Sequence, residues 1–418
     1  MNLAEEFKKY ASSDAFFYIT LDPERALGVE DILPNYHVIC PYKSWLTDAL
    51  KDSGVRVFVL EEEVGLDEAM KIAEKGSYGI MQANLVKDYI AKKAGTVPAL
   101  RANILVLKTS ALIEDFCKSQ GWNLLAPKAN VAEEFENKIS QFKILRGVVP
   151  FPKSRISTME EVYNIAKSLN GEDATVIQFN RGHSGNTTFF VKSVSDIEEL
   201  YKLFPKREVK ISEFKKGKTY TLNCLVLRNR RVITGSISQQ LTGLPEATSN
   251  PNSTVGNDWG SARNLSGGVF RKIKEMAEKS GSAMCKEGYA GLFGIDVLVE
   301  NSSAGSLEDD SNEVYFIELN THQPASVSLE AKIHRNLGKV PLLGYFLLDS
   351  AGEAEISEED LPPLILPINA RQIIYRNKSS QVMSRGQILS EFSGKPFISR
   401  VLEVKPNEEV WREQAVDL

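Results

Sequence analysis

Oxygen-bearing side chains interrupt two apolar segments of the chain. Asp296 lies within Gly291–Val299 (GLFGIDVLV), and Glu318 and Asn320 lie within Phe316–Asn320 (FIELN). Two carboxylates brought together repel each other and need a compensating cation. Mg²⁺ prefers oxygen ligands, takes few of them from the protein and completes its shell with water and phosphate. We therefore expect Asp296, Glu318 and Asn320 to hold one or two magnesium ions. Carboxylates that only meet solvent at strand ends are the alternative.

This metal site requires the two segments to be neighbouring strands. The stretch between them, Asn301–Asn312 (NSSAGSLEDDSN), is polar and acidic, which is typical of a long hairpin tip. If the strands pair through it, Asp296 faces Glu318 across the ladder. Because side chains alternate along a strand, we also expect Phe316 on the same face as Glu318.

A glycine-bearing loop lies between two apolar strands in Val176–Val191 (VIQFNRGHSGNTTFFV). Its backbone N–H groups can close over a polyphosphate, and basic side chains lie at the same tip. An ordinary surface hairpin is the alternative, since glycine turns are common. The spacing around the serine is not that of a nucleophile elbow, which argues against a serine hydrolase. The loop residues concerned are Arg181, Gly182, His183, Ser184 and Gly185.

Short apolar runs alternate with helical patterns in the first third of the chain. The runs Ala15–Thr20, Val55–Leu60 and Asn103–Leu107 are typical of buried strands, and Met81–Lys93 and Ser110–Gln120 of helices. This alternation predicts a parallel, doubly wound sheet. No Rossmann glycine fingerprint follows these strands, so a dinucleotide site has little support there.

The pattern changes near Pro127. Helices are expected at Val131–Leu145, Thr158–Ser168 and Phe270–Lys286, with strands dominating between Thr175 and Asn320. After an acidic connector, Ala370–Arg376 begins a small strand-rich tail.

Composition limits the class of protein. The chain has 418 residues, 42% hydrophobic and 25% charged, which predicts two or three globular domains. The net charge of −5 argues against a nucleic-acid partner. No apolar run is long enough for a membrane span, and no basic and apolar leader begins the chain. Four scattered cysteines fit free thiols in a reducing compartment, so we expect a cytoplasmic protein without a membrane partner.

The order of these motifs resembles the ATP-grasp superfamily, most closely its carboxylate–amine ligases with an N-terminal pre-ATP-grasp domain. The resemblance covers roughly residues 127–329. It implies that Lys138 reaches the phosphates of ATP and that Gly182–Asn186 cover them. Gln178 stands where a second lysine is typical of the family. Lys138 and Arg181 are therefore the main candidates to neutralise the phosphates.

The segment Lys210–Leu222 (KISEFKKGKTYTL) is similar to the hinge of this family. The resemblance implies that adenine bonds the backbone near Glu213 and Lys215, with Ile211 or Phe214 as an apolar wall. Thr219 takes the position of a ribose-binding acid. A charged surface strand is the alternative.

The magnesium signature of the family matches Asp296, Glu318 and Asn320. Family members often carry arginines where this chain has Gly294 and His322. The positively charged side chain that would stabilise the acyl phosphate is thus unassigned. Its candidates are Arg263, Arg271 and Arg335.

Substrate contacts are expected from two segments. Thr321–Ser328 follows the metal strand, which places His322, Gln323 and Ser326 near an acceptor. The polar stretch around Trp259 offers Asn257 and Asp258, although a capped surface loop is an equal alternative.

The resemblance implies an α/β N-terminal domain with a parallel sheet, then an α+β ATP-grasp fold of two subdomains that clasp ATP, and a small C-terminal strand-rich extension. The expected boundaries are 1–126, 127–204, 205–350 and 351–418. The implied function is an ATP- and Mg²⁺-dependent ligase that forms an amide or peptide bond through an acyl phosphate. Its partners are small carboxylate and amine substrates, and a homodimer is left open. A non-catalytic nucleotide-binding subunit and a biotin-carboxylase-like enzyme are the alternatives.

Overall fold

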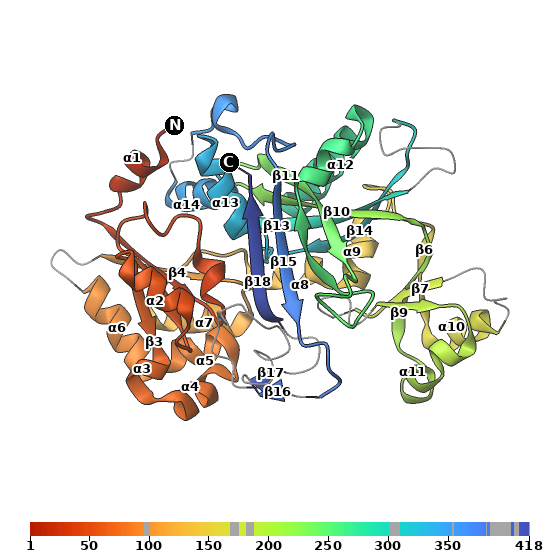
Figure 1. Ribbon diagram of the computed structural model, residues 1–418, viewed down its shortest axis with the longest axis horizontal. Helices are drawn as coiled ribbons and strands as arrows, with labels where there is room; N and C mark the ends of the chain where they lie inside the picture. Colours follow the sequence, from red (N-terminus) through yellow and green to blue (C-terminus); the bar gives the residue numbers. More distant parts are fainter. Residues whose placement is uncertain are drawn as a thin grey trace.

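The computed structural model describes residues 1–95, 100–167, 175–180, 188–300, 310–352, 355–381, 383–384, 403–404 and 409–417. Three sheets of four or more strands organise this part of the chain (Figure 1). No described helix has both the length and the apolar character that crossing a lipid bilayer requires.

The first sheet is parallel throughout, in the order β3-β2-β1-β4-β5. Its strands are β1 (Asp14–Ile19), β2 (Tyr36–Cys40), β3 (Arg56–Val59), β4 (Arg101–Val106) and β5 (Asn123–Leu124). All residues of β1 and β2 are buried, because both faces of the sheet are covered. The predicted parallel α/β sheet is thus confirmed. The sequence patterns missed β2, whose short apolar run is interrupted by His37.

Helices surround this sheet (Figure 1). They are α1 (Leu3–Lys8), η1 (Pro23–Ala26), α2 (Trp45–Asp52), α3 (Leu60–Val64), α4 (Leu66–Ala73), α5 (Gly76–Gln82), α6 (Asn84–Ala94) and α7 (Ala111–Gln120). The single helix expected at Met81–Lys93 is divided between α5 and α6, because Ala83 is extended at φ −60°, ψ 128°. Helix α7 agrees with its prediction, and Ser110 caps it by accepting from the backbone N–H of Ile113.

A similar break divides the helix expected at Val131–Leu145. Asn137 is extended (φ −75°, ψ 117°) between α8 (Ala129–Glu136) and α9 (Lys138–Leu145). Asn180 holds the start of α9: its carbonyl accepts from the backbone N–H of Lys138 and its side chain from that of Ile139, both at 3.0 Å. Lys138 is therefore the first residue of a helix and lies beside the end of the strand that leads to Asn180.

The second sheet is antiparallel, in the order β6-β9-β7-β8. Its elements are β6 (Ser154–Thr158), α10 (Met159–Ala166), β7 (Thr175–Gln178), β8 (Thr188–Val191), η2 (Val194–Asp196), α11 (Glu198–Leu203) and β9 (Glu208–Glu213). Helix α10 starts at Met159 because the Thr158 side chain caps it. Met159, Val162 and Ile177 belong to a separate small core that joins the helices to the sheet.

The third sheet is antiparallel, in the order β14-β13-β10-β11-β12-β15-β18. Its strands are β10 (Gly217–Val226), β11 (Val232–Thr242), β12 (Thr254–Asp258), β13 (Gly291–Glu300), β14 (Val314–Asn320), β15 (Ala370–Arg376) and β18 (Glu409–Val416). Helix α12 (Gly267–Lys286), capped by Ser266, packs on one face through Val269, Ile273 and Met276. The opposite face is free to line a cleft.

The C-terminal strands do not form a separate tail. Strand β15 pairs with β12 and with β18, so both extend the third sheet. The remaining elements are η3 (Gly260–Asn264), α13 (Val327–Asn336), α14 (Leu342–Ala351), η4 (Glu358–Asp360), β16 (Met383–Ser384) and β17 (Glu403–Val404). Helix α14 shares one hydrophobic core with Phe16 and Tyr18 of β1, which joins the third sheet's helices to the first sheet.

Candidate functional site

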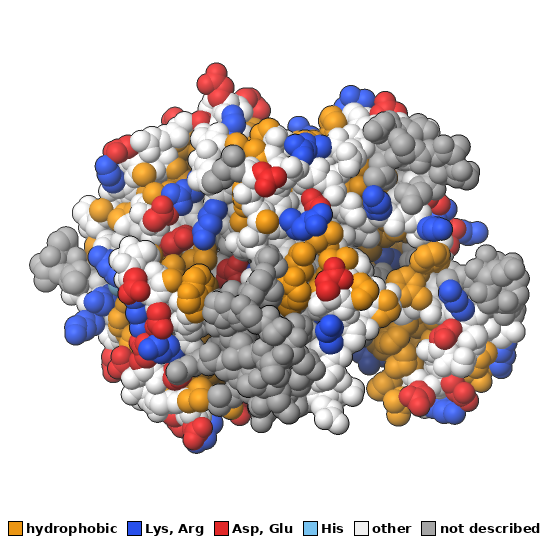
Figure 2. All heavy atoms as spheres, viewed as in Figure 1, with side chains coloured by type: hydrophobic (Ala, Val, Ile, Leu, Met, Phe, Trp, Pro, Cys, Tyr) orange, Lys and Arg blue, Asp and Glu red, His pale blue; other side chains and the backbone are white. Residues whose placement is uncertain are grey.

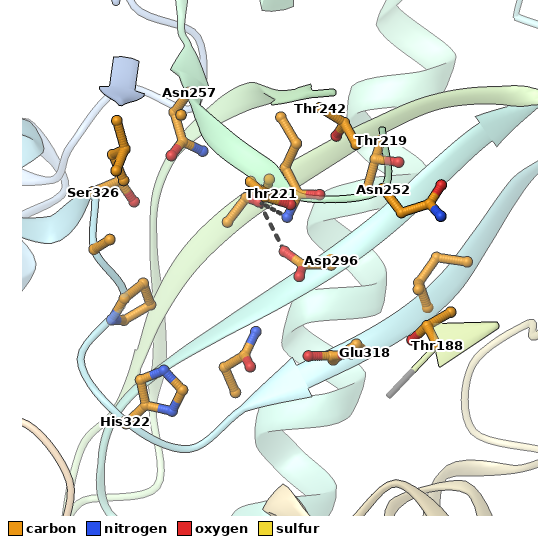
Figure 3. Close-up of a pocket in the computed structure, with 18 of the residues that line it drawn as sticks. Thr188, Thr219, Thr221, Thr242, Asn252, Asn257, Asp296, Glu318, His322 and Ser326 are labelled. Carbon is orange, nitrogen blue, oxygen red and sulfur yellow. Dashed lines mark hydrogen bonds between the residues drawn. The ribbon is translucent and has the colours of Figure 1, made fainter. Parts of the chain in front are cut away.

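Two adjoining cavities lie between the second and third sheets. The hinge cavity, of about 500 Å³, is lined by Val176, Phe190, Lys210, Phe214 and Leu298, among others. The acidic cavity, of about 390 Å³, is lined by Asp296, Glu318, Asn320, His322 and Ser326, among others (Figure 3). Gln178, Thr188, Thr219, Gln240 and Ile317 line both, so the two cavities form one continuous cleft.

The two carboxylates lie opposite each other across the ladder, as expected. Asp296 of β13 is the register partner of Glu318 of β14, and Gly294 is the partner of Asn320. Glu318, Asn320 and Asp296 all line the acidic cavity.

The expectation that Phe316 shares the face of Glu318 is wrong. Val297 pairs with Phe316, so Ile317 is an extra residue in β14. This bulge turns Phe316 into the core beneath α12, while Ile317 and Glu318 both line the cleft. A bulge reverses the alternation of side chains, which the local sequence did not signal.

The electrostatics of Asp296 follow from this juxtaposition. Burial and the charge of Glu318 raise the pKa of Asp296 to about 7, against hydrogen bonds from Thr221 and Gln240 and the charge of Lys138. Thr221 donates to Asp296 Oδ1 at 2.8 Å (Figure 3). Without a bound cation, the ionisation of both carboxylates at neutral pH is therefore unfavourable.

Lys138 contacts Glu318 directly. Its Nζ lies 2.5 Å from Glu318 Oε2, and its side chain is only 7% exposed. The start of α9 thus delivers an ammonium group to the edge of the carboxylate pair.

Lys210 is a second ammonium group, which the sequence reasoning did not single out. It is the register partner of Gln178 across β7 and β9, and its Nζ donates to Gln178 Oε1 at 3.2 Å and to the carbonyl of Ile317 at 3.4 Å. The group is buried and lies 4.8 Å from the ring centre of Phe151. Burial and the charge of Lys138 lower the pKa of Lys210 to about 7, while Glu318 opposes the shift. The sequence feature that could have identified Lys210 is a charged residue that interrupts the apolar residues of a strand.

The hinge residues line the apolar end of the cleft. Glu213, Phe214, Lys215 and Thr219 all belong to the hinge cavity, whereas Ile211 lies in the small core of the second sheet. Phe214 is 46% exposed. Figure 2 shows hydrophobic side chains gathered over the second sheet, on the side toward the third sheet.

The loop that follows β7 contains Arg181, Gly182, Ser184 and Gly185, which lie outside the described residues. Gln178, at the end of β7, is buried and lines both cavities.

The segment after β14 enters the acidic cavity in part. His322 and Ser326 line it, but Gln323 points away and donates to the carbonyl of Arg25 at 2.7 Å. Glu136 holds the ring of His322, with Nδ1 at 3.3 Å. Although burial opposes it, the hydrogen bond and charge of His322, with Lys108, keep the pKa of Glu136 well below its ordinary value.

Of the two candidates in the stretch around Trp259, one lines the acidic cavity. Asn257 lines it, whereas Asp258 is buried against Arg371 and Trp259 is fully buried in a core. Alternation along β12 places Asp258 on the opposite face from Asn257.

The three candidate arginines lie elsewhere, which corrects their assignment. Arg263 bonds Asn369 and the carbonyl of Pro367 beside a different hollow, and Arg335 pairs with Asp31 through both terminal nitrogens. Arg271 is exposed on α12, on the far side of the third sheet. Among the residues that the structure describes, the arginines that line the acidic cavity are Arg25 and Arg376.

The donor set fits a hard divalent cation. Two facing carboxylates and the amide of Asn320 supply oxygen, and the raised pKa of Asp296 indicates that added positive charge would be favourable. No group of three or more His, Cys, Asp or Glu side chains with metal-binding geometry occurs in the described ranges. A bound magnesium ion would therefore take its other ligands from water and phosphate.

No protein-family model matches the chain, and no curated protein matches it in sequence. Solved structures do match in fold. One is N5-carboxyaminoimidazole synthase from Aspergillus clavatus in complex with ADP and 5-aminoimidazole ribonucleotide, with TM-score 0.60, 13% identity and coverage of 97% of this chain and 94% of that one.

A biotin carboxylase from Campylobacter jejuni, in complex with an ATP analogue, has TM-score 0.60 and 12% identity over 95% of this chain and 84% of that one. The biotin carboxylase domain dimer of 2-oxoglutarate carboxylase from Hydrogenobacter thermophilus, with MgADP and bicarbonate, has TM-score 0.58 and 12% identity over 96% and 85% of the two chains. At such identities the similarity establishes the fold.

Proposed function

Because the chain has the ATP-grasp fold, we propose that it is an ATP- and Mg²⁺-dependent ligase that activates a carboxylate as an acyl phosphate and transfers the acyl group to an amine. One observation carries this proposal. The facing carboxylates Asp296 and Glu318 and the ammonium groups of Lys138 and Lys210 gather where an apolar cavity joins a polar one.

The hinge cavity supports adenine binding. Its walls include Phe214, Leu298 and Ile317, and the backbone around Glu213 and Lys215 runs along it. Thr219 lines both cavities, where the ribose would pass from one to the other. A nucleotide bound in this way would have its phosphates toward Asp296, which lines the acidic cavity.

The junction of the cavities supports phosphate binding. Asp296, Glu318 and Asn320 would hold magnesium, which when bound neutralises charge on the phosphate oxygens. Lys138 and Lys210 supply positive charge at the same place. We retain Arg181, Gly182, Ser184 and Gly185 as the proposed cover of the phosphates, with Gln178 beneath them.

The reaction has two steps. A substrate carboxylate oxygen attacks the γ-phosphorus of ATP, and the bond between that phosphorus and the bridging oxygen of the β-phosphate breaks. The products are ADP and an acyl phosphate. An amine then attacks the acyl carbon, inorganic phosphate leaves, and the amine loses a proton. The protein contributes mainly positioning, charge neutralisation and exclusion of water. His322, oriented by Glu136, is our candidate to accept the proton.

Carboxylation is the second candidate. The matching solved structures are named as a carboxyaminoimidazole synthase and as biotin carboxylases. In that case bicarbonate is the activated carboxylate, and the amine receives a carboxyl group. Both candidates share the acyl-phosphate step. An amino-acid or peptide substrate, the domain boundaries after residues 126, 204 and 350, and a homodimer remain our proposals.

The test follows ADP release with a panel of amino acids, small peptides and amines, with and without bicarbonate. A carboxylate labelled with ¹⁸O should pass one labelled oxygen to the released phosphate, and mass analysis should identify an amide or a carbamate. Nucleotide binding without any substrate-dependent ADP release would instead indicate a non-catalytic nucleotide-binding subunit.

A further inference from the structure

A further hollow, of about 760 Å³, lies beside the segment that connects α9 to β6, the edge strand of the second sheet (Figure 1). We call it the basic hollow, because Lys143, Arg146, Lys153 and Arg155 all line it. Of its described lining residues, Pro152 also lines the hinge cavity and none lines the acidic cavity. The basic hollow is therefore a separate place from the junction that holds Asp296 and Glu318.

The charge of the basic hollow is of one sign. The described residues that line it include four basic ones and no acidic one. All four basic side chains are exposed, and none makes an ion pair or a hydrogen bond within the described ranges. Exposed lysines elsewhere, such as Lys202, Lys274 and Lys279, pair with a glutamate on the same helix. In a chain of net charge −5, these four unpaired positive charges repel one another, and an anion would relieve that repulsion.

The end of α9 fixes one rim of the basic hollow. Lys143 and Arg146 are three residues apart, a spacing that makes them neighbours on a helix surface. A type II turn follows, in which the backbone N–H of Val148 donates to the carbonyl of Leu145 at 2.9 Å. Arg146 is extended there (φ −60°, ψ 129°) and Gly147 has φ +82°, a value that favours glycine. This turn holds Arg146 at a corner of the chain.

The second sheet fixes the opposite rim. Lys153 and Arg155 are two residues apart in extended backbone and so lie on one face. Arg155 is the register partner of Ile211 in β9. The carbonyl of Lys153 accepts from the backbone N–H of Glu213 at 3.0 Å, and the N–H of Lys153 donates to Glu213 Oε1, also at 3.0 Å. Backbone that is held in this way lowers the entropy lost when a ligand binds between the rims.

The floor of the basic hollow is apolar. Phe142, Val149 and Phe151 line it, and the two aromatic rings lie edge-on with their centres 5.1 Å apart. An inorganic anion would use the basic rim alone, whereas an organic anion would also cover this floor. The volume lies within the range of about 300–1,000 Å³ that is typical of sites for small molecules.

We propose that the basic hollow binds a small organic anion that carries at least two negative charges and an apolar part. Arginine and lysine bind phosphate and carboxylate oxygens through charge-assisted hydrogen bonds, so phosphate esters and dicarboxylates share the required chemistry. The site lies outside the proposed nucleotide cleft, and the inference does not rest on the ligase function. The hollow's apolar floor and the chain's negative net charge favour a small molecule over a nucleic acid.

The test measures binding to the full chain by calorimetry at pH 8, with MgADP present to occupy the nucleotide cleft. Phenyl phosphate and phenylmalonate are both dianions with an aromatic ring. Inorganic phosphate and malonate lack the ring, and benzyl alcohol lacks the charge. We expect the ring-bearing anions to bind more tightly than their ringless counterparts and benzyl alcohol not to bind. The tighter of the two ring-bearing anions identifies the source, a phosphate ester or a dicarboxylate.

Substitutions locate the binding. R146Q and R155Q should each weaken it about tenfold, and the double variant R146Q/R155Q should abolish it. R271Q/K274Q, which makes the same change of charge at exposed positions of α12, is the matched control and should bind as the original chain does. Because all four positions are exposed, we expect unchanged melting temperatures, which verify folding.

A second measurement needs no variant. Phenyl phosphate should slow the modification of Arg146 and Arg155 by phenylglyoxal, read by peptide mass mapping, and leave the modification of Arg271 unchanged.

Three results would overturn the inference: binding that R146Q/R155Q retains, equal affinity for ring-bearing and ringless anions, or an absence of both binding and protection in the original chain. A duplex oligonucleotide that binds through these arginines when no small dianion does would replace the small molecule with a nucleic acid. MgADP is titrated separately. Its failure to bind would count against the proposed function and leave the comparison of R146Q/R155Q with the original chain as the test of the basic hollow.

Discussion

Lys210 Nζ donates to Gln178 Oε1 at 3.2 Å across the ladder that joins β9 to β7, and the two residues are register partners. The family resemblance places a lysine at Gln178. In this chain the ammonium group instead comes from the neighbouring strand and reaches the same wall of the cleft. We propose that this residue, 32 positions away, takes the role of the family's lysine.

The first prediction concerns this exchange of strands. K210M should raise the dissociation constant of MgATP about tenfold or more, because a charge-assisted contact to phosphate is lost. The double variant K210M/Q178K, which returns the charge to β7, should recover part of that loss. Calorimetry with a non-hydrolysable ATP analogue gives both values. K202M, at an exposed lysine of α11, serves as control, and equal affinity of K210M and the original chain would refute the role.

The second prediction concerns the facing carboxylates. D296N and E318Q, like D296A and E318A, should lower substrate-dependent ADP release by about 100-fold or more, since the cation that neutralises the phosphates loses a charged ligand. E278Q, an exposed i,i+4 partner of Lys274, is the control. Near-normal turnover of both D296N and E318Q would contradict the site.

The third prediction is that substitutions of these two carboxylates change the stability of the metal-free protein in opposite directions. The pKa of Asp296 is raised, so its charged form is less favourable in the folded state at pH 8. D296N should therefore raise the melting temperature in the presence of a chelator. E318Q should lower it, because the buried Lys138 then has no carboxylate partner. Calorimetric melting at pH 8 measures both effects. A shift of the melting temperature in the same direction for both variants would count against this account.

The fourth prediction concerns Phe214, which is 46% exposed at the hinge cavity and lies edge-on to Phe190. F214A should raise the KM for ATP about three- to tenfold and change kcat little, since an adenine contact is made equally in ground and transition states. F204A removes a similarly exposed ring outside the cavity and should have no effect. A fall in kcat without a change in KM would exclude Phe214 as an adenine wall.

The fifth prediction concerns pH and the buried Glu330 of α13. Burial raises the pKa of Glu330 to about 7, against hydrogen bonds from the Ser236 backbone and Asn223. Because the folded-state pKa exceeds the unfolded one, the stabilisation is complete below about pH 4.5 and declines as pH rises to about 7, by at most ~1.4 kcal/mol per pH unit. E330Q should flatten this slope in urea unfolding between pH 5 and 8. An unchanged slope would exclude Glu330 as its source.

Some features of the site could be predicted because their causes are local. Polar residues that interrupt apolar strands at Asp296 and Glu318 indicated a pair across a ladder, since alternation and a polar hairpin tip together specify register. The Ser110 cap and the buried β1 likewise follow from short-range patterns. The parallel first sheet followed from the alternation of strand and helix patterns, whereas the ATP-grasp order of elements came from the family resemblance.

Other features depend on contacts between distant residues. The bulge at Ile317 sends Phe316 into the core, and no local residue marks it. Lys210 became a candidate only once β9 lay beside β7. Gln323, expected near the substrate, instead holds η1 and thereby positions Arg25.

The sequence by itself determined which strands carry Asp296, Glu318 and Asn320, because the alternation of side chains acts over a few residues, whereas the break that makes Lys138 the first residue of a helix was not predicted. Only the tertiary structure decided which cations meet those ligands. Arg25 and Arg376 are separated by most of the chain, and they share a cavity because β15 joins the third sheet while the loop after β14 binds η1. Such convergence arises from packing, which no segment encodes alone.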